Sequence, residues 1–149
     1  MVGSVWGVRF KDWAYLPSVG WSGGILIIWD VRSLKAEECI MGNFTLSIRF
    51  SPSHGENWWL TGVYGPCRYR ERGEFWEELA SLYGLCGDNW CLGGDFNIIR
   101  FPSEKKGEGG NRITKSMRDF DAFINETNLR DPNVNNVEFT WSNADLILG

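Results

Sequence analysis

The sequence predicts an α/β protein of the α+β kind, in which an antiparallel or mixed β-sheet is covered by helices. The order of the elements carries this prediction. Short apolar or alternating runs, typical of strands, fill the first part of the chain, and stretches with helical spacing begin only near residue 72. A protein built from βαβ units would instead alternate strands and helices from its start.

The length and composition fit one globular domain over residues 1–149. Hydrophobic residues make up 43% of the chain and charged residues 23%, which allows a core and excludes a disordered segment. No apolar run approaches the roughly 18 residues of a membrane span, and no signal peptide opens the chain. We therefore expect an intracellular protein without membrane contact. Its four cysteines lack C-x-x-C spacing and are expected to be free thiols.

Strands are predicted at several places along the chain. The first twenty residues read as one or two short strands, and the apolar run at 23–30 as a buried strand. In "NFTLSIRFS", apolar residues at even positions alternate with polar ones, which predicts a strand with one wet face. Further strands are predicted at 58–64, before Gly65-Pro66, and at 90–94 and 137–142.

Two stretches have the spacing of helices. "RGEFWEELASLYGL" places its large apolar residues at helical intervals, and Gly84 is the predicted C-cap. "TKSMRDFDAFINETNL" is the second predicted helix, and a polar, glycine-rich loop at 103–111 precedes it.

The stretch "WCLGGDFNIIR" places an acid and an amide at the end of a strand. Unpaired polar groups are costly to bury there. Asp95 and Asn97 are two positions apart, so an extended backbone points them to one side and Phe96 toward the core. A carboxylate can orient or deprotonate a water, and an amide can hold a phosphate oxygen. The structural alternative is a turn, which Gly-Asp-x-Asn also favours.

Tyr64 ends a different strand in the stretch "VYGP". Its hydroxyl is suited to donate a hydrogen bond to a phosphate oxygen. The structural alternative is a core tyrosine whose hydroxyl is satisfied within the protein.

Taken together, these motifs resemble the endonuclease/exonuclease/phosphatase superfamily. The resemblance rests on "GGDFN" after an apolar strand, "VYGP" before a helix and "FTWS" after "LRDP". "SVGWSGGILIIWD", "ENWWLTGVYGP" and "GGDFNIIRFPSEKKG" look closer still to the endonuclease domain of plant non-LTR, LINE-type retrotransposons. The resemblance covers nearly all of the chain and implies a four-layer α/β sandwich, two packed β-sheets flanked by helices, that is incomplete here.

The resemblance also implies a role for each candidate residue. Asp95 matches the aspartate that orients or activates the attacking water, and Asn97 the asparagine that holds the scissile phosphate and helps place that aspartate. Tyr64 matches the tyrosine that contacts the phosphate. Trp141 falls in the "TW" strand, whose aromatic residue lines the substrate pocket.

Other parts of the family's site have no counterpart in this sequence. The family's first strands carry an asparagine and the glutamate that binds Mg²⁺, and its last strand an aspartate and a histidine that contacts the phosphate. We expect the chain to begin after that glutamate and to end before that histidine, which His54 does not replace. Mg²⁺ is thus a cofactor of the parent family, no metal ligand is assigned here, and activity is expected to be weak or absent.

The function implied is hydrolysis of a DNA phosphodiester, a nick in the target before reverse transcription, by a nuclear enzyme without an obligate protein partner. One alternative is a phosphatase of the same superfamily that acts on an inositol phosphate or a phospholipid head group. Another is a non-enzymatic remnant or interaction module. The net charge of −4 disfavours a simple nucleic-acid-binding module but not a nuclease.

Overall fold

The computed structural model describes residues 10–19, 23–100, 102 and 112–130. The chain divides into two compact units, Met1–Asn97 and Ile98–Gly149, which are treated separately below. Within the described residues, the elements are a two-stranded sheet, a four-stranded sheet and two α-helices. This is a mixed α/β arrangement consistent with an incomplete α/β sandwich, as the sequence predicts.

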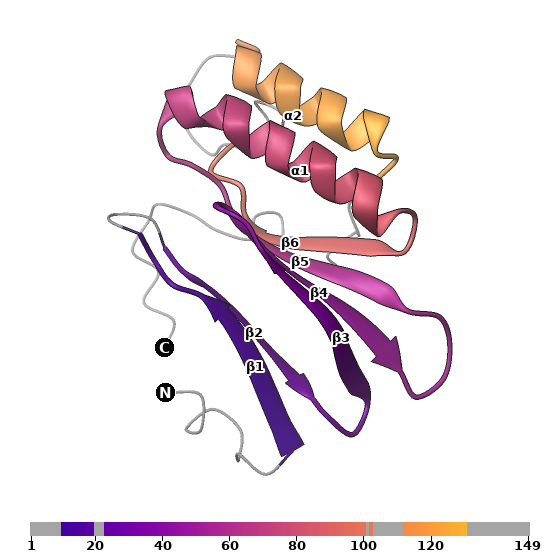
Figure 1. Cartoon of the computed structure of the whole chain (residues 1–149). Coiled ribbons are helices and arrows are strands. Elements are labelled where there is room, and N and C mark those ends of the chain that lie inside the picture. The colour runs from indigo at the N-terminus through magenta and orange to yellow at the C-terminus, as the bar shows by residue number, and fades with distance from the viewer. Residues whose placement is uncertain (1–9, 20–22, 101, 103–111, 131–149) are drawn as a thin grey trace, which may run out of the picture. The chain divides into compact units, whose positions relative to one another are not determined.

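The first unit contains both sheets and the first helix. Its strands are β1 (Lys11–Leu16), β2 (Ile25–Asp30), β3 (Leu34–Met41), β4 (Thr45–Pro52), β5 (Trp58–Tyr64) and β6 (Trp90–Asp95). Strands β1 and β2 form an antiparallel pair, and the larger sheet has the order β3-β4-β5-β6 (Figure 1). Only β5 and β6 run parallel, because α1 (Arg72–Cys86) lies between them in the sequence.

An apolar layer joins the two sheets. Ile25, Ile27 and Trp29 of β2 form one buried cluster with Leu46, Ile48 and Phe50 of β4. The Trp29 and Phe50 rings meet edge to face with their centroids 5.3 Å apart. Strand β2 was expected to be buried throughout, but Leu26, on its other face, is 48% exposed. Buried and more exposed side chains alternate along β2 because only one face of the two-stranded sheet packs against the core.

The opposite face of β4 is polar and was expected to be wet, which is wrong. Thr45 and Ser47 are buried, with 1% and 0% of their surface exposed. Helix α1 covers this face with the fully buried Phe75 and Leu79. The Ser47 and Thr61 hydroxyls lie 2.8 Å apart, and Trp90 Nε1 donates to Thr61 Oγ1 at 2.8 Å. Because each polar group finds a partner, the layer tolerates burial.

A carboxylate on α1 fixes the turn between β3 and β4. Glu78 accepts hydrogen bonds from the backbone N–H groups of Asn43 and Phe44 at 3.0 and 3.1 Å. Its Oε1 also accepts from Thr45 Oγ1 at 2.6 Å. One side chain therefore joins the helix to both the turn and the start of β4.

The first predicted helix is present, but one strand was missed and one predicted strand cannot be compared. Helix α1 passes through Gly84, the predicted C-cap, and ends at Cys86, with Gly87, which has a φ of 64°, as its C-cap. Strand β3 was not predicted, because most of its side chains are exposed and many are polar. The strand predicted at 137–142 lies outside the described residues.

The second unit contains α2 (Lys115–Glu126), which the sequence predicts. Thr114 caps it, accepting a hydrogen bond from Met117 N at 3.2 Å. Arg100 donates through Nε to Asp121 Oδ1 at 2.7 Å and through a terminal nitrogen to Asn125 at 3.3 Å. The segment that follows the candidate motif is thereby attached to α2.

All four cysteines are free thiols, as expected. Burial raises the pKa of the Cys86 thiol to about 11, with a smaller contribution from Glu38. No helix in the described part of the chain is both long and apolar enough to cross a membrane.

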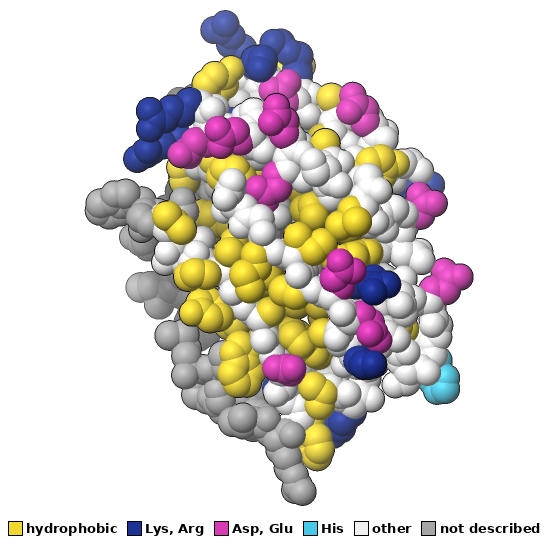
Figure 2. Space-filling model, viewed as in Figure 1, with side chains coloured by type: hydrophobic (Ala, Val, Ile, Leu, Met, Phe, Trp, Pro, Cys, Tyr) yellow, Lys and Arg dark blue, Asp and Glu magenta, His cyan; other side chains and the backbone are white. Residues whose placement is uncertain are grey.

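The outer face of the two-stranded sheet is apolar and exposed. Trp13, Tyr15 and Leu26 share this face and are 45%, 57% and 48% exposed. Figure 2 shows hydrophobic side chains reaching the surface over the strands. A contiguous apolar surface of this kind favours self-association.

We expect the purified chain to bind a hydrophobic dye and to self-associate through this face. Replacing Trp13 and Leu26 by Thr, which keeps strand propensity, should lower both dye fluorescence and apparent mass in sedimentation. Val31→Thr is the control, since Val31 is equally exposed, at 48%, but lies outside the strands. A monomeric wild-type chain that binds no dye would contradict this expectation.

We expect the buried hydrogen bonds among Ser47, Thr61 and Trp90 to contribute to the free energy of unfolding. Thr61→Val keeps the shape of the side chain but removes the acceptor of Trp90 Nε1 and the partner of Ser47. Leaving such a buried group unsatisfied costs about 1–3 kcal/mol. The free energy of unfolding in urea should fall by that amount. Ser81→Ala, which removes an exposed hydroxyl bonded to its own helix, should change it by less than about 0.5 kcal/mol.

Candidate active site

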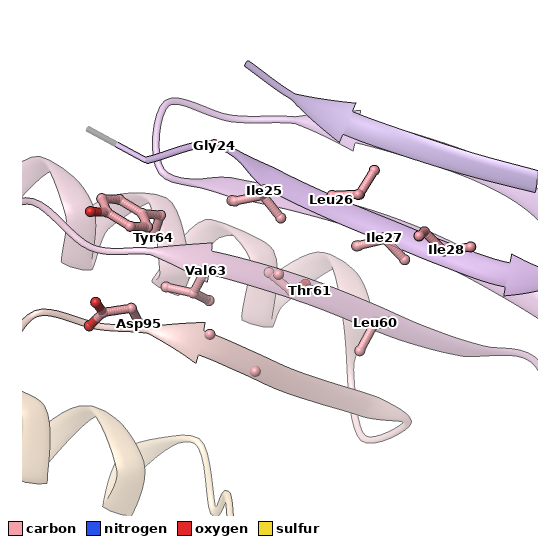
Figure 3. Close-up of a pocket in the computed structure, with 13 residues that line it drawn as sticks. Gly24, Ile25, Leu26, Ile27, Ile28, Leu60, Thr61, Val63, Tyr64 and Asp95 are labelled. Atoms are coloured by element: carbon pink, nitrogen blue, oxygen red, sulfur yellow. The ribbon is translucent and has the colours of Figure 1, made fainter. Parts of the chain in front are cut away.

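The parallel pairing of β5 and β6 brings two of the candidate residues together. Tyr64 and Asp95 are the last register partners of the two strands, so both stand at the carboxyl end of the sheet. Figure 3 shows the two side chains at the same end of adjoining strands. The family resemblance implies that these two strands are neighbours and end at the same edge, and the strand pairing confirms this arrangement.

A glycine allows β6 to approach β5 at this end. Gly94 has a φ of 138°, a conformation that L side chains rarely adopt, and a Cβ there would overlap the Val63 carbonyl oxygen. At Gly93 a Cβ would meet nothing within 4 Å. Of the two glycines, only Gly94 therefore has to be a glycine for the strands to pair as they do.

Asp95 begins a turn rather than continuing the strand. Its carboxylate oxygen Oδ1 accepts a hydrogen bond from the Asn97 backbone N–H at 2.8 Å, and Asn97 has a left-handed φ of 53°. The extended geometry expected for Asp95 to Asn97 is therefore wrong, because the strand ends at Asp95. Phe96, expected to be buried, is half-buried and lies edge-on to Phe75 with ring centroids 6.2 Å apart.

The side chain of Asn97 ties the two strand ends together. Its Nδ2 donates to the Gly65 carbonyl oxygen at 2.6 Å, and Gly65 N donates to the Asp95 carbonyl oxygen at 2.6 Å. A Cβ at Gly65 would overlap the backbone of Phe96, so the two segments meet at van der Waals contact. Asn97 thus holds the turn that carries Asp95. One N–H of the Asn97 side-chain amide is used for this hydrogen bond within the protein.

Tyr64 differs from a core tyrosine with a satisfied hydroxyl. The residue is half-buried, and its hydroxyl has no hydrogen bond to any residue within the described ranges. Its ring lies against Gly23, where an added Cβ would be only 2.6 Å from Cε2. The contact with Gly23 therefore fixes the position of the ring.

An open groove of about 480 Å³ leads along β2 to this end of the sheet (Figure 3). Its described lining comes from β2 and the residue before it, and from β5 and β6; it comprises residues 24–28, 60–64 and 93–95. Most of the lining is apolar or glycine, and Tyr64 and Asp95 supply its hydroxyl and its carboxylate at one end. The groove can accept an extended ligand with a polar group at Tyr64 and Asp95.

The residues at this end do not by themselves fit a resident metal ion. Within the described ranges, no group of three or more His, Cys, Asp or Glu side chains is placed to hold one. Asp95 is the one carboxylate in the described lining of the groove, and its Oδ1 already accepts the Asn97 N–H. Mg²⁺ prefers near-octahedral oxygen ligation. No step is therefore assigned to a metal ion.

Neither a scan of protein-family models nor a search of curated proteins finds a match to this chain. The family resemblance therefore stays a prediction, and the site rests on its own geometry. Trp141, the expected pocket aromatic, lies outside the described residues. His54 is exposed in the turn between β4 and β5.

Sequence reasoning missed the part that Gly65 plays. The Gly65-Pro66 pair was interpreted only as the end of a strand, yet the Gly65 backbone both donates to Asp95 and accepts from Asn97. The sequence does contain a signal for this role: Gly65 directly follows Tyr64, the candidate residue that ends its strand. A glycine at such a position permits another backbone segment to approach closely.

The two neighbouring glycines of β6 give a matched test of this geometry. Gly94→Ala should lower the free energy of unfolding by about 1–3 kcal/mol or more, since it combines a strained φ with an overlap at Val63. Gly93→Ala should be nearly neutral. Thermal melts followed by circular dichroism would measure both, and equal losses for the two variants would contradict the strand geometry described here.

Proposed function

We propose that this chain is an endonuclease-type hydrolase that cleaves a DNA phosphodiester bond at Tyr64 and Asp95. One observation carries the proposal: a tyrosine and an exposed carboxylate are register partners at the carboxyl end of a parallel strand pair. Within the described ranges the Tyr64 hydroxyl makes no hydrogen bond, and Asn97 holds the turn that carries Asp95. The family resemblance adds the substrate class and a role in nicking target DNA during retrotransposition.

Each residue has a defined part in the proposed reaction. Asp95 keeps one oxygen on the Asn97 N–H and uses the other to accept a proton from water. The water oxygen forms a bond to phosphorus as the bond to the leaving sugar oxygen breaks, and that oxygen takes a proton from solvent. The Tyr64 hydroxyl donates a hydrogen bond to a non-bridging phosphate oxygen, where charge develops.

The character of the groove favours a phosphodiester over a multiply charged inositol phosphate. None of its described lining residues is a lysine or an arginine. A ligand with several phosphate monoesters needs several cations, whereas one diester carries a single charge. An extended groove also suits a strand better than a compact head group. DNA as substrate implies a nuclear location.

We expect the cleavage to be slow. One carboxylate supplies general-base catalysis, which contributes about 10²–10⁴-fold. The described residues offer no ligand set for a metal ion, so its charge stabilisation is not available from them. The parent family's Mg²⁺ should therefore raise the rate only slightly.

The test is nicking of supercoiled plasmid by the pure chain, with and without Mg²⁺. Slow nicking is expected, and Asp95→Asn should reduce it by roughly 100-fold or to background, because the amide cannot accept the proton. Asp88→Asn makes the same change just before β6, at its other end, and should leave the rate unaltered.

Circular dichroism would check that both variants keep the fold. Undetectable nicking, or equal rates for the two variants, would overturn the nuclease proposal. Phosphate release from an inositol phosphate that depends on Asp95 would favour the phosphatase alternative instead.

A further inference from the structure

A second cavity, also of about 480 Å³, adjoins Tyr64. Tyr64 is the one described residue that lines both this cavity and the groove. A ligand that reaches Tyr64 from the groove therefore meets this cavity next.

Arg68 is the cationic residue in the described lining of this cavity. Its side chain is exposed, and within the described ranges its guanidinium makes no ion pair or hydrogen bond. Arg32 and Arg100 are in contrast both paired with carboxylates. Although Glu71 and Glu74 line the same cavity, Arg68 is left able to bind an anion.

An apolar wall of the same cavity is made by Leu16, Pro17, Val19 and Phe44. Val19 is 79% exposed, so this wall is open to a ligand. Phe44 is held in place, because its ring lies edge-on to Phe75 at 5.6 Å and its carbonyl accepts from Tyr64 N at 2.9 Å. An apolar surface beside a phosphate-binding cation suits the sugar and base of a nucleotide.

We propose that this cavity binds the nucleotide next to the scissile phosphate in a DNA strand. Arg68 pairs with the flanking phosphate, and the sugar and base lie along the apolar wall. The carboxylates of Glu71 and Glu74 accept hydrogen bonds from base amino groups. This assignment rests on the proposed nuclease function and names a subsite for its substrate.

Binding of a short, fluorescently labelled single-stranded DNA, measured by anisotropy in EDTA, tests the subsite without cleavage. Arg68→Gln should raise the dissociation constant by about fivefold or more. It should also reduce the magnitude of the slope of log K against log salt concentration by about 0.7, which corresponds to the loss of one phosphate contact. Arg70→Gln is the matched control. Arg70 is exposed, lies two residues away and does not line the cavity, so both quantities should stay close to those of the unmodified chain.

A second variant, Val19→Asp, tests the apolar wall of the cavity. A carboxylate there should repel the strand and weaken binding to a similar degree. Equal effects of Arg68→Gln and Arg70→Gln, or no effect of either, would overturn the subsite. So would an inositol phosphate that displaces the DNA in an Arg68-dependent manner.

The outcomes separate this inference from the function on which it rests. Nicking that depends on Asp95, with binding unaffected by Arg68→Gln, would overturn the subsite and leave the nuclease. Binding that depends on Arg68 and Val19, without nicking, would overturn the nuclease and leave a strand-binding cavity.

Discussion

The close parallel approach of β5 and β6 at their carboxyl ends is the constraint on which the candidate site depends. It needs a residue without a side chain at Gly94, because the Val63 carbonyl occupies the space. Once the strands are this close, Tyr64 and Asp95 come into register, and the Gly65 backbone reaches Asp95 and Asn97. The hydroxyl and the carboxylate are thus positioned by backbone contacts rather than by contact with each other.

The layers on the two sides of the four-stranded sheet hold it by different means. Toward β2 the contact is apolar and close, and a Cβ at Gly62 would lie 2.6 Å from Ile25. Toward α1 the contact includes the hydrogen-bonded hydroxyls of Ser47 and Thr61. An apolar layer tolerates small shifts, whereas a hydrogen-bonded layer fixes position, so the polar layer holds the register of β4 and β5.

The sequence was sufficient where hydrophobic period and turn chemistry agree. It predicted five of the strands and both helices, whereas the shared edge of Tyr64 and Asp95 was implied by the family resemblance. It missed β3, whose exposed polar edge lacks an apolar signal, and the burial of Thr45 and Ser47, which depends on where a distant helix docks. The direction of the Asn97 side chain was also beyond it, because a left-handed residue breaks the alternation that a strand pattern assumes.

Glu78 has a further consequence for the way the first unit assembles. The amide groups that it binds, in the turn between β3 and β4, lie up to 35 positions before it in the sequence. Until α1 docks, these groups have only water as a partner for this interaction, so the hairpin and the helix gain stability together. Closing so long a loop is a non-local event that slows folding. Amide hydrogen exchange at Asn43 and Phe44 would accordingly report the undocking of a helix that neither residue belongs to.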